Sequence, residues 1–221
     1  MLRHPGNKNL HLHYDRTFEG FPIMFDKGPF FYEYLKSLKR VVDCALDQYS
    51  RVMAFRVDLR LPIGMDLPRF AYTNEVISRF FESFAARIES NRRAAHRVNK
   101  VVHECKVRYF WVREIGLLGT PHYHTVILLN EDAFYSLGRR ISDNMNMLTR
   151  LDRSWDSALS VRSNSYDGLV HIPDNAVYRL KRNAPVATDQ LPNFFRRASY
   201  LCKAATKEFG SGQHAFGCSR G

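Results

Sequence analysis

Residues 51–62, with the sequence RVMAFRVDLRLP, alternate between apolar and charged side chains over most of their length. The apolar positions on one side of such an extended chain are Met53, Phe55, Val57, Leu59 and Leu61. Arg56, Asp58 and Arg60 project from the opposite side. A period of two residues is that of a β-strand, so the segment predicts a strand with one face on a core and one charged face. The rest of the chain must therefore supply the neighbouring strands of a sheet.

Further strands and several helices are predicted from local patterns. Residues 107–114 (VRYFWVRE) and 122–130 (HYHTVILLN) are β-rich runs joined by IGLLGTP, which is typical of a hairpin. Shorter strands are expected at residues 169–173 (LVHIP) and 176–182 (AVYRLKR). Apolar residues at helical spacing predict helices over 30–46, from Thr73 or Asn74 onward, around 147–155, and from about Asn193 to Gly210.

This order of elements predicts an α+β fold. The hairpin makes the sheet at least partly antiparallel, and the helices are expected to cover one face of it. The other face is expected to be open and to carry the binding site, because Arg56, Asp58 and Arg60 project there. Residues 1–28 are polar and then punctuated by Gly and Pro, so they are expected to form an arm.

The charge of the chain points to a polyanionic partner. There are 33 Lys and Arg residues against 22 Asp and Glu residues, which gives a net charge of +11 at pH 7. Such an excess is typical of proteins that bind nucleic acid. No apolar run approaches the ~20 residues that span a bilayer, and residues 1–16 lack the apolar core of a signal peptide. The four scattered cysteines are expected to be reduced thiols of a cytoplasmic protein.

Two His-x-His pairs are candidates for a metal site, at His11/His13 and at His122/His124. The first pair lies in the expected arm and is predicted to be solvated. The second pair opens a predicted strand, where positions i and i+2 project from the same face. Glu114, at the end of the preceding strand, can reach the same point across the hairpin. From these residues alone, a metal site and an exposed polar face are equally good interpretations.

The last predicted helix, NFFRRASYLCKAATKEF, adds a further constraint. At about 100° per residue, Arg196, Tyr200, Lys203 and Lys207 share a face opposite the apolar stripe. Core packing does not explain a tyrosine on this basic face, whose cations can contact phosphates and stabilise a phenolate. The same Tyr-x-x-Lys spacing occurs at Tyr178, but that segment is predicted to be a strand, where Tyr and Lys three residues apart face opposite sides.

Glu-x7-His-x-His on a hairpin, followed by Tyr-x-x-Lys on a helix, resembles the HUH endonucleases that initiate rolling-circle replication. FRVDLRLP, HYHTVILLN and FFRRASYLCKAATK are similar to the inovirus-type replication proteins of bacterial prophages, the YagK/YfjJ C-terminal domain family. The resemblance covers residues 51–221, so that the expected division is an N-terminal arm and helix over 1–50 and an HUH domain over 51–221. It implies an RRM-like or ferredoxin-like antiparallel sheet with the metal on its open face.

The resemblance also implies roles for individual residues. Glu114, His122 and His124 would bind the metal, Tyr200 would be the nucleophile, and Lys203 would assist it. The expected reaction is the nicking and joining of single-stranded DNA at a phage or mobile-element origin through a 5′-phosphotyrosine, and oxygen and imidazole ligands suggest Mg²⁺ or Mn²⁺. The expected phosphate contacts are Arg56, Arg60, Arg196 and Lys207.

The expected partners follow from the same interpretation. A host helicase and polymerase are expected, because no G-x-x-x-x-G-K-[ST] motif is present. The sequence leaves open whether the protein forms a homodimer. The alternative from another class is a non-catalytic protein that binds single-stranded nucleic acid, with Tyr109, Trp111 and Tyr123 as stacking platforms. Metal-dependent nicking of single-stranded DNA separates the two.

Overall fold

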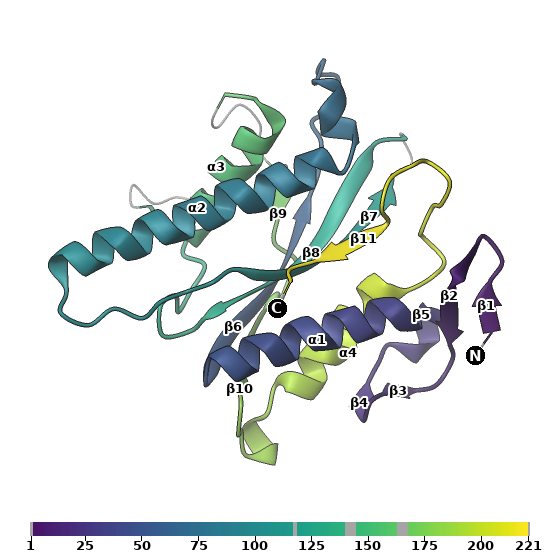
Figure 1. Ribbon diagram of the computed structural model, residues 1–221, viewed down its shortest axis with the longest axis horizontal. Helices are drawn as coiled ribbons and strands as arrows, with labels where there is room; N and C mark the ends of the chain where they lie inside the picture. Colours follow the sequence, from purple (N-terminus) through teal and green to yellow (C-terminus); the bar gives the residue numbers. More distant parts are fainter. Residues whose placement is uncertain (1, 117–118, 140–144, 163–167, 221) are drawn as a thin grey trace.

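The computed structural model describes residues 2–116, 119–139, 145–162 and 168–220. Its centre is a six-stranded sheet in the order β10-β6-β8-β7-β11, with β9 also paired to β6 (Figure 1). All the pairings are antiparallel. The strands are β6 (Arg51–Leu59), β7 (Arg108–Ile115), β8 (Pro121–Asn130), β9 (Val170–His171), β10 (Val177–Lys181) and β11 (Phe216–Cys218). The mixed α+β class and the hairpin of β7 and β8 are therefore confirmed, although residues 117–118 of its loop lie outside the described residues.

The helices cover both faces of this sheet. α2 (Glu75–Val98) and α3 (Met147–Leu159) pack on the face that carries Phe55 and Val57. α1 (Tyr32–Gln48) and α4 (Leu191–Ser199) pack on the other face. The prediction that one face is open is therefore wrong for part of the sheet. The charged residues of β6 indicated an open face, but Val52 and Ala54 begin the same face and are fully buried.

On that second face, the side chains change from apolar to polar along each central strand. In β6 it runs from Val52 and Ala54 to Arg56 and Asp58, and in β8 from Leu128 and Val126 to His124 and His122. In β7 it runs from Phe110 and Val112 to Glu114. The apolar ends lie in the core with α1 and α4. Because the polar ends lie side by side in the pairing register, they form one polar region on the sheet.

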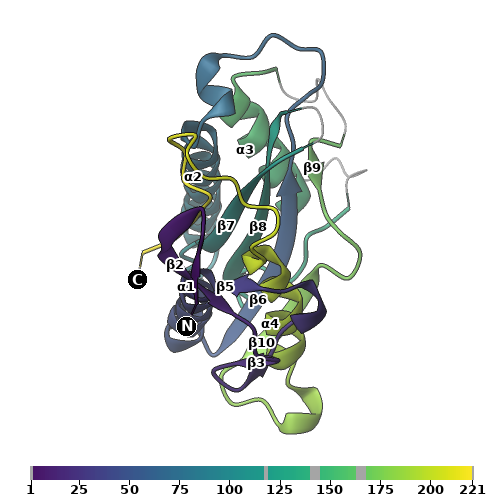
Figure 2. The same cartoon turned by 90° about the vertical axis from the view of Figure 1, so that its right-hand side faces the viewer.

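The N-terminal residues are folded and are not a polar arm. β1 (Leu2–His4), β2 (Asn7–His13) and β5 (Phe30–Phe31) form a three-stranded sheet, and β3 (Thr17–Phe18) pairs with β4 (Phe21–Pro22). Leu10, Leu12 and Phe18 are buried in the same core as α1 and α4. The predicted boundary between the two parts of the chain, at residue 50, thus falls within one continuous hydrophobic core, which contains residues from both sides of it. In Figure 2, these strands and α4 gather at the lower end of the molecule.

The last helix is shorter than predicted. α4 ends at Ser199, and a 3₁₀ turn over Tyr200–Cys202 follows. Lys203 is extended, with φ −59° and ψ 141°, and forms a β-bridge with Phe30. The next amide, that of Ala204, donates to the Pro29 carbonyl at 2.8 Å. The pairing with the N-terminal segment therefore ends the helix well before Gly210.

The remaining regular elements of the described residues are three short 3₁₀ turns, at Phe25–Lys27, Arg69–Tyr72 and Val186–Thr188. The predicted helices over 30–46, after Asn74 and around 147–155 are confirmed as α1, α2 and α3. In the described part of the chain, no helix has both the length and the apolar composition needed to cross a membrane.

Candidate metal centre

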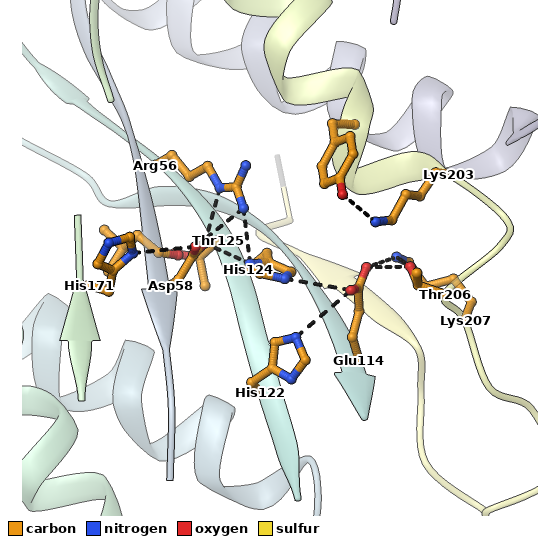
Figure 3. A network of polar contacts seen from close by, with 12 residues as sticks. Arg56, Asp58, Glu114, His122, His124, Thr125, His171, Lys203, Thr206 and Lys207 are labelled. Atoms are coloured by element: carbon orange, nitrogen blue, oxygen red, sulfur yellow. Dashed lines mark hydrogen bonds and ion pairs between the residues drawn. The ribbon is translucent and has the colours of Figure 1, made fainter. Parts of the chain in front are cut away.

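Glu114, His122 and His124 lie together on the polar part of the sheet (Figure 3). Glu114 is near the end of β7, and the register of the hairpin places it directly opposite His122. His124 is two residues further along β8, so its side chain projects from the same face as that of His122. The Glu114 Oε2 atom is 3.8 Å from Nε2 of His122 and 3.6 Å from Nε2 of His124.

These separations suit one bound cation. Ligand atoms held about 2.1 Å from an ion, at angles of roughly 90 to 120°, lie about 3.0 to 3.6 Å apart. The potential ligand atoms of Glu114, His122 and His124 all lie within 4.8 Å of one another. The carboxylate–imidazole distances are longer than hydrogen bonds. A small inward movement of three side chains therefore brings them to metal–ligand distances.

The second oxygen of Glu114 is held by residues that follow α4. Glu114 Oε1 accepts hydrogen bonds from Thr206 Oγ1 and Lys207 Nζ, each at 2.6 Å. Burial favours the neutral carboxyl, but the nearby His124 imidazole and the contacts of Lys207 outweigh it and hold the pKa of Glu114 well below its usual range. One oxygen is thus anchored while the other faces the histidines.

His124 is oriented by Asp58 of the neighbouring strand. His124 Nδ1 lies 2.7 Å from Asp58 Oδ1, and Arg56 Nε donates to the same oxygen at 3.0 Å. Despite burial, these partners lower the pKa of Asp58 to about 2. An ionised Asp58 accepts the Nδ1 proton of His124, which leaves Nε2 as the free nitrogen directed at Glu114. Metal-binding histidines commonly have such a carboxylate partner.

The pKa values of the two histidines are shifted in opposite directions. Burial and the neighbouring His124 lower the pKa of His122, so it is neutral at pH 7 and offers a lone pair. Burial also opposes the charged form of His124, but the carboxylates of Asp58 and Glu114 reverse the effect and raise its pKa. Because a metal ligand must be deprotonated, any proton released on metal binding is expected to come from His124 rather than from His122.

Tyr200 and Lys203 lie beside this network. Lys203 Nζ donates to the Tyr200 hydroxyl at 2.6 Å, and Figure 3 shows Lys203 extending above the cluster from the chain after α4. The Arg56 guanidinium carbon is 5.9 Å from the centre of the Tyr200 ring. Arg56 therefore lies against both Asp58 and Tyr200. Tyr200 was predicted to stand on an exposed face, but it is half-buried.

The predicted outward basic face is confirmed for Arg196 and wrong for Lys203 and Lys207, which are both buried. Arg196 and Arg60 are exposed, and Arg56 is half-buried. The Lys207 side chain is 0% exposed and pairs with Glu114, because the helix ends before it. Burial lowers the pKa of Lys207, and Glu114 opposes this change.

The roles of Thr206 and His171 were not anticipated from the sequence. Thr206 bonds to Glu114 Oε1, and His171 on β9 has Nδ1 3.7 Å from Asp58 Oδ2. No local motif marks either residue, because β9 and the chain after α4 reach the site through tertiary packing. Asp58 could have been found, since it shares the charged side of its strand with Arg56.

His11, His13 and Tyr178, the alternative candidates for the metal ligands and the nucleophile, make structural contacts elsewhere in the fold. The prediction that His11 and His13 are solvated is wrong: His11 Nδ1 is 2.7 Å from Glu33 Oε1, and His13 Nε2 is 2.9 Å from the Thr17 carbonyl. Tyr178 lies on β10, as predicted, and packs edge-on against Phe194 of α4.

The expected stacking platforms are also part of the core. Trp111 is 8% exposed and Tyr123 is 0% exposed. Tyr109 stacks on Phe81 of α2, with 3.6 Å between the ring centres. All three rings face α2 and α3, on the side of the sheet away from the metal cluster. Trp111 and Tyr123 are buried there, and Tyr109 is half-buried with Phe81 stacked on its ring.

Comparison with known proteins extends the resemblance toward the N-terminus. The family model of the YagK/YfjJ C-terminal domain matches residues 13–219. In Escherichia coli strain K12, the uncharacterized protein YagK is 33% identical over 193 residues, which cover 85% of this chain and 92% of YagK. The uncharacterized protein YfjJ is 32% identical over 195 residues, which cover 85% of this chain and 94% of YfjJ. No solved structure matches. The chain therefore belongs to the YagK/YfjJ C-terminal domain family.

Proposed function

We propose that this protein is an HUH-type endonuclease that nicks and joins single-stranded DNA at a phage or mobile-element origin to start rolling-circle replication. The observation that carries the proposal is the position of Tyr200, with its Lys203 partner, beside Arg56, whose guanidinium group also contacts His124 of the Glu114–His122–His124 cluster. A nucleophile, a cation beside it and a set of metal ligands are what phosphodiester transfer requires. The HUH fold and a cytoplasmic location in a bacterial host belong to the same proposal.

Each residue then has a defined chemical task. A bound Mg²⁺ or Mn²⁺ would polarise the scissile phosphate. The Tyr200 hydroxyl oxygen forms a bond to phosphorus as the bond from phosphorus to the 3′ oxygen breaks. The phenol proton passes to solvent, and the 3′ oxygen takes up a proton to give a free 3′-OH. Lys203, at 2.6 Å from the hydroxyl, stabilises the negative charge that develops on the tyrosine oxygen.

The charges around the cluster support a nucleic-acid substrate. Arg56 lies between Tyr200 and Asp58, and Arg60 and Arg196 are exposed. These arginines are proposed to contact the phosphates on either side of the scissile bond. Lys207 is not included, because its ammonium group is buried against Glu114. Strand separation would be supplied by a host helicase and synthesis by a host polymerase.

Replacing Tyr200 should abolish DNA cleavage without abolishing DNA binding. Tyr200→Phe removes one oxygen and leaves the ring, the arginines and the metal ligands, so it should bind single-stranded origin DNA nearly normally and cut none. Tyr178→Phe is the matched control, since it removes the same atom from a tyrosine with the same spacing to a lysine, and it should cut normally. The assay is denaturing electrophoresis of a labelled oligonucleotide with and without Mn²⁺. Cleavage by Tyr200→Phe would contradict the assignment, and metal-independent binding without cleavage by the wild type would favour the non-catalytic alternative.

Metal binding has its own test. Changing His122 and His124 to Ala should abolish Mn²⁺ binding measured by calorimetry, because two of the three ligands are lost. Changing His11 and His13 to Ala should leave it intact, because that pair bonds to Glu33 and to a backbone carbonyl. Unchanged Mn²⁺ affinity in the first variant would show that the ion binds elsewhere.

A further inference from the structure

A second polar site lies between α2 and α3, on the side of the sheet away from the metal cluster. It is a pocket of about 290 Å³. Its lining residues, named here the arginine pocket, are Arg87, Ser90, Asn91, Ala94, Met145 and Arg150. The pocket combines two guanidinium groups with a hydroxyl and an amide, and its carbon-rich part comes from Ala94 and Met145. Such a donor set is suited to an oxyanion.

The two guanidinium groups are incompletely neutralised. The Arg87 Nε atom is buried and has no hydrogen-bond partner among the described residues, while its Nη2 donates to the Arg153 carbonyl at 3.3 Å. Arg150 is 8% exposed, and its contact with the Met145 carbonyl is long, at 3.5 Å. Within the described ranges, neither forms an ion pair with a carboxylate. By contrast, Arg79 and Arg93 of α2 pair with Glu75 and Glu89.

A third arginine adds to the positive charge. The guanidinium carbons of Arg92 and Arg150 lie 4.5 and 5.8 Å from the centre of the Phe134 ring. Burial, together with the charge of Arg92, lowers the pKa of Arg150. Buried like charges destabilise a fold unless an anion or a hydrogen-bond acceptor compensates them. The ring contacts offset only part of this cost, because a cation over an aromatic ring gains about 0.5 to 2 kcal/mol.

We propose that the arginine pocket binds a phosphate group of a nucleic-acid backbone. Arg87 and Arg150 supply paired N–H donors for the phosphate oxygens, and Ser90 and Asn91 supply further polar groups at the rim. Arg97, in the last turn of α2, and Lys100, just after α2, are exposed. They would extend the positive surface toward neighbouring phosphates. This inference goes beyond the proposed function, since it rests on neither the metal nor Tyr200.

The test is the affinity for a labelled single-stranded oligonucleotide, measured by fluorescence anisotropy across a salt series with a chelator present. Arg150→Met should weaken binding at low salt about tenfold or more, because it removes a charge-assisted contact. It should make the slope of log affinity against log salt less negative by roughly 0.7, the value for one phosphate contact on a single strand. The variant keeps an unbranched side chain beside Phe134, so its packing is retained. Arg79→Met is the matched control, because Arg79 of α2 likewise lies over an aromatic ring, that of Phe70, but pairs with Glu75.

A second arm distinguishes the source of the phosphate. Inorganic phosphate should raise the melting temperature of the wild type above that in chloride of equal ionic strength, and Arg150→Met should lose the increase. If only the phosphate effect is lost and oligonucleotide binding is unchanged, the assignment to a nucleic-acid backbone is overturned in favour of a small phosphate compound. If neither changes, in this variant or in Arg87→Gln as a second replacement, the pocket is not an anion site. None of these readouts requires metal or cleavage, so failure here leaves the proposed endonuclease activity untouched.

Discussion

The buried pair of Lys207 and Glu114 gives the sharpest test of how the metal ligand is held. Lys207→Met removes the ammonium group and keeps most of the aliphatic volume. The two side chains are 0% and 8% exposed, with 2.6 Å between Nζ and Oε1, so solvent cannot compensate the carboxylate that remains. Removing one partner of a buried pair costs about 3 to 5 kcal/mol. For a chain of this length that corresponds to a fall of about 6 to 20 °C in the melting temperature.

The partner variants separate the pair from its surroundings. Glu114→Gln alone should be similarly destabilising, because it leaves the Lys207 ammonium buried without a counter-charge. The double variant Glu114→Gln/Lys207→Met has no buried charge at this position and should recover most of the lost free energy of unfolding. Urea denaturation of the four proteins gives a coupling free energy that should reach about 3 kcal/mol.

Metal binding supplies an independent measurement on the same variant. Because a divalent cation can take over the neutralisation of Glu114, Mn²⁺ should raise the melting temperature of Lys207→Met more than that of the wild type. If Lys207→Met were as stable as the wild type, or if the two single substitutions were simply additive, the buried ion pair would not be contributing as described.

Three further predictions concern the surroundings of the site and the core. Asp58→Asn should weaken Mn²⁺ binding by about 10- to 100-fold in calorimetry, because Asp58 orients His124; unchanged affinity would contradict that role. The folded-state pKa values of Asp58, about 2, and of Glu114 are lowered. Their contribution to stability should therefore be complete above about pH 5 and be lost as pH falls toward 2, so that the melting temperature drops steeply over this range. Phe18→Ala should cost about 3 to 5 kcal/mol in urea denaturation, because Phe18 is 2% exposed and stacks on Phe195; a negligible cost would mean that the N-terminal strands are not part of the core.

The part of the site that could be predicted from the sequence is the part built by one hairpin. His122, His124 and Glu114 lie within a few residues of one turn, and strand periodicity alone fixes which side chains share a face. Local spacing also predicted that Tyr200 and Lys203 lie together, and they do, although the α-helix ends at Ser199 and a 3₁₀ turn carries Tyr200. These inferences needed no knowledge of the remaining chain.

The parts that failed depend on contacts between distant segments. The N-terminal residues NKNLHLH contain an alternating Leu10 and Leu12, but the strand they form pairs with Phe30–Phe31, and neither partner indicates this pairing by itself. The helical period of the last segment held as far as Leu201 and Cys202, and then the bridge between Phe30 and Lys203 ended the helix. That one tertiary contact moved Lys207 from an expected exposed face into the metal cluster.

The most direct test of the central claim is identification of the residue that becomes linked to DNA. Wild-type protein is incubated with single-stranded origin DNA and Mn²⁺, digested, and the nucleotide-bearing peptide is sequenced by mass spectrometry. The account predicts a 5′-phosphotyrosine at Tyr200, formed only when the divalent ion is present. A link at Tyr178 or another residue would contradict the geometry of the site, and the absence of any adduct with every divalent ion tested would contradict the proposed reaction.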